Sequence, residues 1–302
     1  HGSHQVNVST EAELREAIGN AEPGDEIILA AGIYRLSHQL WIDKKGTANN
    51  PIVIRSAGDK YSAKLTGSSE EGINIGDGAA YIVVDGLEVY GMGDNNIHVQ
   101  NASYITLQNI KSHDAGSDGD VIKVNQANHI IVQNNELARS GARPGCPEEN
   151  CWQELIDFVD TDDSAIRDNV MTDFGNLAGY VKGGSTNVEI TGNTISGQRS
   201  GAGDPAWGIG GWTDSELLRG RQYEAINVRF EQNILTNNQY GALGIYDASN
   251  VRIQNNTFNN NHGVLIEFRA GNAPKASSDN ITITANRFNN NSLSSDGLCV
   301  IS

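Results

Sequence analysis

The sequence predicts an all-β fold in which the chain winds into a parallel solenoid, a stack of coils built from short strands. Two observations predict it. A segment of similar sequence recurs from residue 82 to the end of the chain, and an asparagine recurs at one position inside that segment. Segments that repeat at this spacing, with apolar and polar residues alternating inside each copy, are typical of solenoid proteins.

Each copy of the repeat begins with an alternating strand, as in YITLQNIKS and NVEITGNTI. The first inward position of that strand aligns at Ile82, Ile105, Ile130, Ser164, Val188, Val228, Val251 and Ile281. These positions are 23, 25, 34, 24, 40, 23 and 30 residues apart. A base unit of about two dozen residues therefore carries three insertions, and the chain should form about nine or ten coils.

A column of asparagines follows five residues after these positions. It reads Leu87, Ile110, Asn135, Asn169, Asn193, Asn233, Asn256 and Asn286. Amide side chains stacked one coil above another can hydrogen-bond along the axis and satisfy the backbone of a turn. We therefore expect this column to be structural rather than catalytic.

The N-terminal part is predicted to cap the solenoid. Thr10 and Glu13 have the spacing of a capping box, and residues 14–18 carry an apolar stripe. The sequence therefore predicts a short helix over residues 10–18 that closes one end of the stack.

The composition fits one elongated domain. The chain has 302 residues, 38% of them hydrophobic, with 34 glycines and 6 prolines. Residues 1–4 have the pattern of an expression scar, and residues 5–302 should form a single domain. No apolar run is long enough to span a membrane. The 37 acidic and 21 basic residues give a net charge of -16, which repels an anionic polymer at long range. We expect no nucleic acid and no membrane as a partner, and we expect a monomer.

Two of the three cysteines, Cys146 and Cys151, bracket the short loop CPEENC inside an insertion, while Cys299 stands alone. A disulfide that closes this loop is the favoured interpretation, since no His or Cys nearby completes a metal site with the two thiols. Disulfides persist mainly in oxidising compartments, so this interpretation predicts a secreted protein.

Three further segments carry a resemblance to a known group of proteins. They are PGDEIILAAGIYR (Pro23 to Arg35), GTANNPIVIRS (Gly46 to Ser56) and YIVVDGLEV (Tyr81 to Val89). The sequence resembles the right-handed parallel β-helix proteins that act on carbohydrates, and it is most similar to polysaccharide lyases of uronic-acid polymers. The resemblance implies a right-handed winding and an acidic polysaccharide as substrate, alginate first and pectate next. The β-helix C5-epimerases are similar too, so epimerisation stays open as an alternative.

A lyase of this kind needs three groups on one face. One neutralises the C5 carboxylate, a base removes the C5 proton, and an acid protonates the departing O4. Solenoids present ligands on the outward positions of one strand per coil. In the third strand of successive coils, alternation sends Lys123, Asn125 and Asp157 outward and their apolar neighbours inward.

The next coil contains GYVKGG (Gly179 to Gly184), in which Val181 is the natural inward residue. Tyr180 and Lys182 then lie outward, provided that the following turn is one residue shorter than a strict count back from Val188 gives. A lysine buried among the aliphatic core would cost far more than this change in a turn. We predict Lys182 as the base and Tyr180 as the acid. Lys123 is the alternative base.

Binding of an anionic polymer to an acidic protein requires a local basic strip, and arginine can pair bidentately with a carboxylate. The predicted substrate-binding residues are Arg139, Asn125, Asp157, Arg199, Tyr246 and Arg269. Further candidates for stacking on sugars are Trp207, Trp212 and Phe268, with packing favoured for the last two.

The first expectation for cofactors is that none is required. The alternative is Ca²⁺, because Asp157 and Asp160 belong to a run of carboxylates that could supply hard oxygen ligands. The sequence shows no complete ligand set, and Asp is common in turns for its local backbone hydrogen bonds. Asp157 could instead hold a cationic catalytic residue in place.

Two insertions follow the asparagine-bearing strand at nearly the same offset, residues 139–153 and 199–223. Stacking should place their roots one above the other. We therefore expect both to project from the same side and to wall a groove over Lys123, Asp157 and Lys182.

Two other classes of function stay open. A non-catalytic carbohydrate-binding solenoid would keep the asparagine column without needing Tyr180 and Lys182 together. A glycoside hydrolase would need two carboxylates at a defined separation, for which Asp157 with Asp160 or with Glu267 is the candidate pair.

Overall fold

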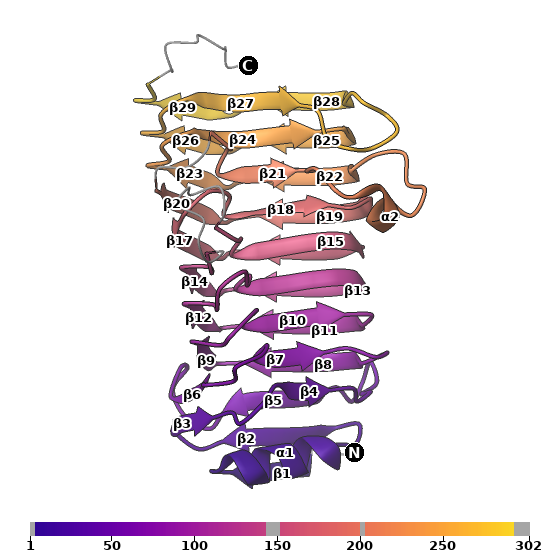
Figure 1. Ribbon diagram of the computed structural model, residues 1–302, viewed down its shortest axis with the longest axis vertical. Helices are drawn as coiled ribbons and strands as arrows, with labels where there is room; N and C mark the ends of the chain where they lie inside the picture. Colours follow the sequence, from indigo (N-terminus) through magenta and orange to yellow (C-terminus); the bar gives the residue numbers. More distant parts are fainter. Residues whose placement is uncertain (1–3, 143–151, 200–202, 293–302) are drawn as a thin grey trace.

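The computed structural model describes residues 4–142, 152–199 and 203–292. The chain winds through coils stacked along one axis, with α1 at one end and the last strands at the other (Figure 1). Neighbouring coils pair through parallel strands, as predicted. The fold is a parallel β-helix, and its core is the narrow interior of the stack.

The strands of the described residues form two parallel sheets, of 19 and 10 strands. The larger sheet bends, so we describe its two faces separately as sheet 1 and sheet 2, and we call the smaller sheet sheet 3. Sheet 1 contains β4 (Leu40–Ile42), β7 (Ile73–Ile75), β10 (Ile97–Gln100), the first part of β13 (Ile122–Gln133), β15 (Ile156–Asp162), β18 (Gly179–Lys182), β21 (Trp207–Ile209), β24 (Gly241–Tyr246) and β27 (Val264–Arg269). Sheet 2 contains β1 (His4–Val8), β2 (Asp25–Leu29), β5 (Ile52–Ser56), β8 (Ala80–Asp85), β11 (Ser103–Gln108), the second part of β13, β16 (Ser164–Arg167), β19 (Ser185–Thr191), β22 (Ala225–Glu231), β25 (Ala248–Gln254) and β28 (Asp279–Thr284). Sheet 3 contains β3 (Gly32–Arg35), β6 (Ala63–Thr66), β9 (Leu87–Tyr90), β12 (Lys111–His113), β14 (Glu136–Ala138), β17 (Val170–Phe174), β20 (Thr194–Gln198), β23 (Ile234–Thr236), β26 (Thr257–Asn259) and β29 (Arg287–Asn289). The long strand β13 runs through the bend, because it pairs with β10 and β15 in sheet 1 and with β11 and β16 in sheet 2.

The strand register confirms the alignment of the repeats. In sheet 2, Ile82 pairs with Ile105, and Ile105 pairs with Ile130. The same column continues through Ser164, Val188, Val228, Val251 and Ile281. The insertions therefore project from the coils and do not shift the register of the paired strands. Inward residues stay inward in every coil of the column.

The asparagine column forms the predicted ladder along the axis. Each Nδ2 donates to the Oδ1 of the asparagine one coil further on, at 2.9 to 3.1 Å, from Asn135 to Asn286. Each Nδ2 also donates to a backbone carbonyl, as Asn193 does to Ile166 at 3.0 Å. A second ladder of Asn238, Asn261 and Asn291 runs beside the first in the last coils, and the sequence analysis missed it.

The N-terminal helix α1 (Glu11–Gly19) confirms the predicted cap. The backbone N–H of Glu13 donates to Thr10 Oγ1 at 3.1 Å, as a capping box requires. Leu14, Ala17 and Ile18 are buried against the first coils. A second helix, α2 (Ser215–Leu218), lies in the loop that follows β21.

The second insertion differs from the prediction. Residues 199–223 do not form one loop, because β21 crosses sheet 1 within them. Residues 203–206 enter β21 from the sheet 3 side, which is also the side from which residues 152–155 enter β15. Residues 210–224 leave β21 toward sheet 2. One coil thus carries an insertion on each side of its sheet 1 strand, and the loops flank sheet 1 at both edges.

The expected disulfide stays a prediction, because Cys146, Cys151 and Cys299 lie outside the described residues. Within the described residues, no helix has the length and apolar character needed to cross a membrane.

Candidate active site

Sheet 1 presents two rows of outward positions. The first row contains Trp41, Asn74, His98, Lys123, Asp157, Tyr180, Gly208, Gly244 and Glu267. The second row, two residues further along the strands, contains Gln100, Asn125, Val159, Lys182, Tyr246 and Arg269. The structure therefore brings the predicted Lys123, Asp157 and Tyr180 onto successive coils, with Lys182 beside them.

Strand β18 alternates as predicted. Val181 is buried in the core, while Tyr180 and Lys182 are partly exposed on the outer face. Lys182 Nζ lies over the Tyr180 ring, 4.2 Å from its centroid, and 3.5 Å from the carbonyl oxygen of Trp212. Among the described residues no carboxylate forms an ion pair with Lys182. Its amine is therefore positioned by a ring and a carbonyl rather than by a counter-ion.

Three carboxylates are buried beside this pair. Oxygens of Asp120, Glu154 and Asp157 lie within 4.8 Å of one another. Asp120 Oδ1 accepts the backbone N–H of Glu154 at 2.8 Å, which fixes two adjacent coils together. Glu154 Oε2 and Asp157 Oδ1 are buried with no hydrogen-bond partner among the described residues. Burying a charged carboxylate without a partner is unfavourable in free energy. Bound protons or a bound cation would therefore stabilise this carboxylate cluster.

Burial and mutual repulsion raise the pKa values around the carboxylate cluster. Burial, reinforced by the charges of Asp157 and Glu154, raises the pKa of Asp120 well above its usual range. Burial, reinforced by Asp157, raises the pKa of Glu154 from 4.5 to about 7. Burial and the same carboxylates also raise the pKa of Tyr180 well above its ordinary value. The Tyr180 hydroxyl therefore stays protonated and can act as a proton donor.

Lys123 is the counter-ion of Asp157. Its Nζ lies 3.5 Å from Asp157 Oδ2. The charge of Asp157 raises the pKa of Lys123 above its usual value, so Lys123 stays an ammonium ion. A lysine held in its charged form is a poor base, and the geometry favours Lys182 over Lys123 for that role.

A polar network continues this face toward the N-terminal coils. Asn125 Oδ1 lies 2.6 Å from His98 Nε2, and His98 Nδ1 lies 2.7 Å from Glu71 Oε1. Glu71 also accepts from Asn74 at 2.8 Å and from Asn95 at 3.0 Å. The predicted contact residue Asn125 is thus oriented by its neighbours.

Asp160 does not belong to the carboxylate cluster that contains Asp157, and a Ca²⁺ site formed by Asp157 and Asp160 stays a prediction. The chain turns at Asp160, whose φ is 48°, and its carboxylate bonds Arg219 and Arg221 of the loop after β21. Of the two candidate hydrolase pairs, Asp157 with Glu267 is too widely separated. Glu267 stands four coils beyond Asp157 in the outward row, or roughly 19 Å at the spacing of parallel strands.

The three predicted arginines pair with carboxylates of the protein. Arg139 and Arg199 share Asp173, at 3.5 and 2.6 Å, beside the turns that lead from sheet 3 to sheet 1. Arg269 bonds Asp204 at 2.7 Å. These contacts neutralise each arginine, and none of them includes the predicted base or acid. Recognition of a substrate carboxylate by these residues stays a prediction.

The aromatic candidates divide by exposure. Trp207 is fully buried, so the prediction that it stacks on sugars is wrong. Its ring packs inward where Gly179 leaves space in the preceding coil. Tyr246 is only 8% exposed, whereas Trp212 and Phe268 are 60% and 46% exposed.

The sequence analysis missed Asp120 and Glu154. Both residues directly precede the apolar pair that opens a sheet 1 strand, in DVIKV and ELIDF. That shared position is the signal that could have found them. The inward and outward alternation of side chains could not identify these two residues, because it applies within a strand and both residues precede the strand.

Two family models match parts of the chain. A model described as "Pel9A-like, right handed beta helix region" matches residues 2–140, and a model described as "Right handed beta helix region" matches residues 219–302. No curated protein sequence matches the chain.

Several solved structures share the fold. The alginate lyase from Paenibacillus sp. str. FPU-7 matches with a TM-score of 0.60 and 18% identity, over 94% of this chain and 99% of that one. Pectate lyase Pel9A matches with a TM-score of 0.69 and 15% identity, over 95% and 80% of the two chains. The Dettilon tailspike protein matches with a TM-score of 0.62 and 12% identity, over 94% and 62%. The chain therefore has a right-handed parallel β-helix fold like that of polysaccharide lyases.

Proposed function

We propose that the protein is a polysaccharide lyase that cleaves a uronic-acid polymer by β-elimination, with Lys182 as base and Tyr180 as acid. The observation that carries the proposal is the position of Lys182 Nζ, 4.2 Å from the Tyr180 ring centroid and beside three buried carboxylates. Elimination needs a base and an acid that reach neighbouring atoms of one sugar, C5 and O4. Two outward residues on one strand meet that need.

In the proposed reaction, Lys182 Nζ takes the C5 proton of the uronate. The electrons of the C5–H bond form a double bond between C4 and C5, and the bond between C4 and O4 breaks. The Tyr180 hydroxyl gives its proton to O4 as it leaves. The raised pKa of Tyr180 keeps this proton in place until the oxygen needs it.

We further propose that Asp120, Glu154 and Asp157 hold a Ca²⁺ ion. Ca²⁺ binds oxygens at about 2.3–2.6 Å, so two ligands of one ion lie at most about 5 Å apart. The three carboxylates meet this limit, and two of their oxygens lack a partner. When bound, such an ion neutralises the substrate carboxylate and makes the C5 proton more acidic. It would take over the role that the sequence analysis gave to the arginines.

The proposed substrate is alginate, with pectate next. Similarity of fold to an alginate lyase and a pectate lyase supports this class of substrate. A C5-epimerase would share the proton abstraction and would return a proton to C5 without breaking the bond to O4. Such polymers lie outside cells, so we also propose that the protein is secreted and acts as a monomer.

The test is to incubate the protein with alginate, polygalacturonate and glycosaminoglycans and to follow the ultraviolet absorbance of the unsaturated uronyl product. We expect absorbance to grow with alginate or, failing that, with polygalacturonate. Reducing ends without absorbance would show hydrolysis instead. If none of these polymers yields a product, the proposed activity is refuted.

Substitution of the lysines tests the roles. Lys182→Ala should lose about 10³-fold or more in turnover and keep its melting temperature, since the side chain is partly exposed. The control is Lys275→Ala, an exposed lysine far along the chain, which should keep full activity. If Lys123→Ala is inactive while Lys182→Ala stays active, the base assignment is wrong although the face is right.

A glycoside hydrolase is the second candidate. The specific observation is that the pKa of Glu154 lies at about 7 while Asp157 pairs with Lys123. A protonated and an ionised carboxyl group about 5 Å apart are the pair that retaining glycosidases use. If that candidate holds, Glu154→Gln should abolish the release of reducing ends, and no absorbance should appear.

A further inference from the structure

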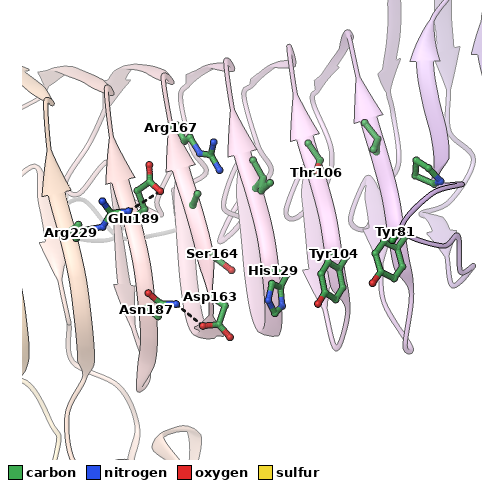
Figure 2. Close-up of a pocket in the computed structure, with 15 residues that line it drawn as sticks. Tyr81, Tyr104, Thr106, His129, Asp163, Ser164, Arg167, Asn187, Glu189 and Arg229 are labelled. Carbon is green, nitrogen blue, oxygen red and sulfur yellow. Dashed lines mark hydrogen bonds and ion pairs between the residues drawn. The ribbon is translucent and has the colours of Figure 1, made fainter.

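The outer face of sheet 2 carries a groove of about 600 Å³ that the proposed reaction does not use. Its lining comes from β8, β11, β13, β16, β19 and β22, and includes Tyr104, His129, Ile131, Asp163 and Arg167. Figure 2 shows the side chains standing in rows across these strands. We call it the sheet 2 groove.

The floor of the sheet 2 groove is an apolar strip. The outward row reads Glu26, Val53, Val83, Thr106, Ile131, Ala165, Glu189, Arg229 and Arg252. Charged residues thus stand beyond both ends, and small or apolar residues occupy the middle. An outward strand position facing water is usually polar, so this local change indicates a surface that a ligand covers.

A row of stacked rings forms one wall. Tyr81 lies 4.4 Å from Tyr104, and Tyr104 lies 4.3 Å from His129, with interplanar angles of 11° and 8°. The rings stand side by side in Figure 2, and the row ends where Asp163 and Ser164 follow His129. The His129 ring is therefore the last of the row, and Asp163 and Ser164 line the groove beyond it.

These rings occupy strained backbone positions. Tyr81 and Tyr104 have φ of 53° and 57°, in the left-handed region that bulky residues rarely adopt. The same turn position in later coils holds Asp163, Asn187, Asn227, Asn250 and Asn280, which tolerate that conformation. Asparagine would therefore serve the turn with less strain. Strained residues of this kind concentrate at ligand sites, and tyrosine here indicates a binding role.

Arg167 supplies a positive charge without a partner. Its Nε is buried and makes no hydrogen bond, and no ion pair to Arg167 exists among the described residues. In a protein of net charge -16, carboxylates are abundant, so an unpaired arginine in a groove indicates an anionic ligand. Asp163 offers an acceptor for hydroxyl groups nearby, with Asn187 Nδ2 donating to its Oδ1 at 2.8 Å.

We propose that the sheet 2 groove binds an acidic saccharide without cleaving it. The C–H face of a sugar would lie on the apolar floor and against His129, its hydroxyls would donate to Asp163, and its carboxylate would pair with Arg167. The proposal goes beyond the proposed function and does not depend on it, since sheet 1 and sheet 2 are different faces of the coil. A second site of this kind would hold a polymer on the protein while sheet 1 acts on it.

Hydrogen exchange of the full chain tests binding in the sheet 2 groove. The measurement uses the Lys182→Ala variant as the background, so that the proposed active site does not cleave the saccharide probes. The probes are a short oligomannuronate and a short oligogalacturonate, with a neutral cello-oligosaccharide of equal length for comparison. We expect an oligouronate, and not the neutral sugar, to protect residues 81–84, 104–107 and 129–132. Arg167→Gln should weaken the affinity for this protection about tenfold or more, whereas Arg252→Gln, an exposed arginine of the same sheet, should not.

Tyr104→Asn is the second variant, chosen because asparagine fits the turn in later coils and should preserve the fold. It should also weaken the protection. The proposal is overturned if neither oligouronate protects these residues, if the neutral sugar protects them equally, or if both Arg167→Gln and Tyr104→Asn bind as the background does. In the chain with Lys182 intact, Arg167→Gln should leave turnover of short substrates unchanged, which separates this site from the proposed active site.

Discussion

The proposed chemistry rests on two side chains of one strand, Tyr180 and Lys182. Their outward direction was predictable, because a period of two inside β18 places Val181 in the core and both neighbours outside. The state of the tyrosine was not predictable, because its raised pKa comes from Asp157 and Glu154. Those residues belong to another coil and meet it only after folding.

Tyr180→Phe tests the proton donor. The ring that Lys182 covers is kept and only the hydroxyl is lost. We expect turnover to fall about 10²-fold or more while KM changes little, because general acid catalysis contributes about that factor. Initial rates by absorbance at several substrate concentrations give both constants. An unchanged turnover would assign the acid elsewhere.

Glu154 predicts how stability depends on pH. Its pKa is raised in the folded state to about 7, so between about pH 4.5 and pH 7 the folded protein holds a proton that the unfolded chain has released. Stability from this group is therefore present below about pH 4.5 and is lost as pH rises through about 7. With a chelator present, the melting temperature should fall across that interval.

Glu154→Gln is the matched control for this effect, because it keeps the shape and removes the titration. As pH rises, the melting temperature should fall less in Glu154→Gln than in the parent protein. The raised pKa of Asp120 lowers the melting temperature in the same direction in both proteins. Added Ca²⁺ should raise the melting temperature of the parent near pH 7 more than that of Glu154→Gln. Equal pH dependence in both proteins would contradict the raised pKa.

At the scale of elements, the asparagine ladders join the coils at their corners. The first ladder could be predicted, because its spacing equals that of the strands and it runs through six coils. The second ladder is confined to the last coils, so its pattern was too short to distinguish from ordinary turn asparagines. Both ladders satisfy buried backbone groups that the turns leave open.

Asn193→Leu tests the first ladder at its middle. Leucine has a similar size and leaves the Asn169 amide and the Ile166 carbonyl without their partners. We expect a loss of about 2–4 kcal/mol in the free energy of unfolding, since each buried unsatisfied group costs about 1–3 kcal/mol. Asn250→Gly is the control, because it removes an exposed amide and keeps a residue suited to φ of 55°. If denaturant unfolding shows the same loss in the free energy of unfolding for Asn193→Leu and for Asn250→Gly, the proposed structural role of the ladder is contradicted.

At the scale of the whole molecule, most of the fold could be predicted from the sequence repeat. Register and coil order followed from the spacing of Ile82 and its counterparts, and the capping helix followed from the spacing of Thr10 and Glu13. The placement of the insertions did not follow, because β21 divides residues 199–223 between the two edges of sheet 1. The carboxylate cluster did not follow either, because Asp120 and Glu154 are 34 residues apart in sequence and meet only when the coils stack.

The mass of the products tests the central claim most directly. The purified protein is incubated with alginate or polygalacturonate, and the oligosaccharides are analysed by mass spectrometry. β-Elimination adds no water, so we predict that the two new fragments together have the mass of the cleaved polymer and that the fragment with the unsaturated end is lighter than a saturated one by one water. Fragments that are all saturated, with one water gained for each bond cleaved, would contradict the account and would favour the hydrolase.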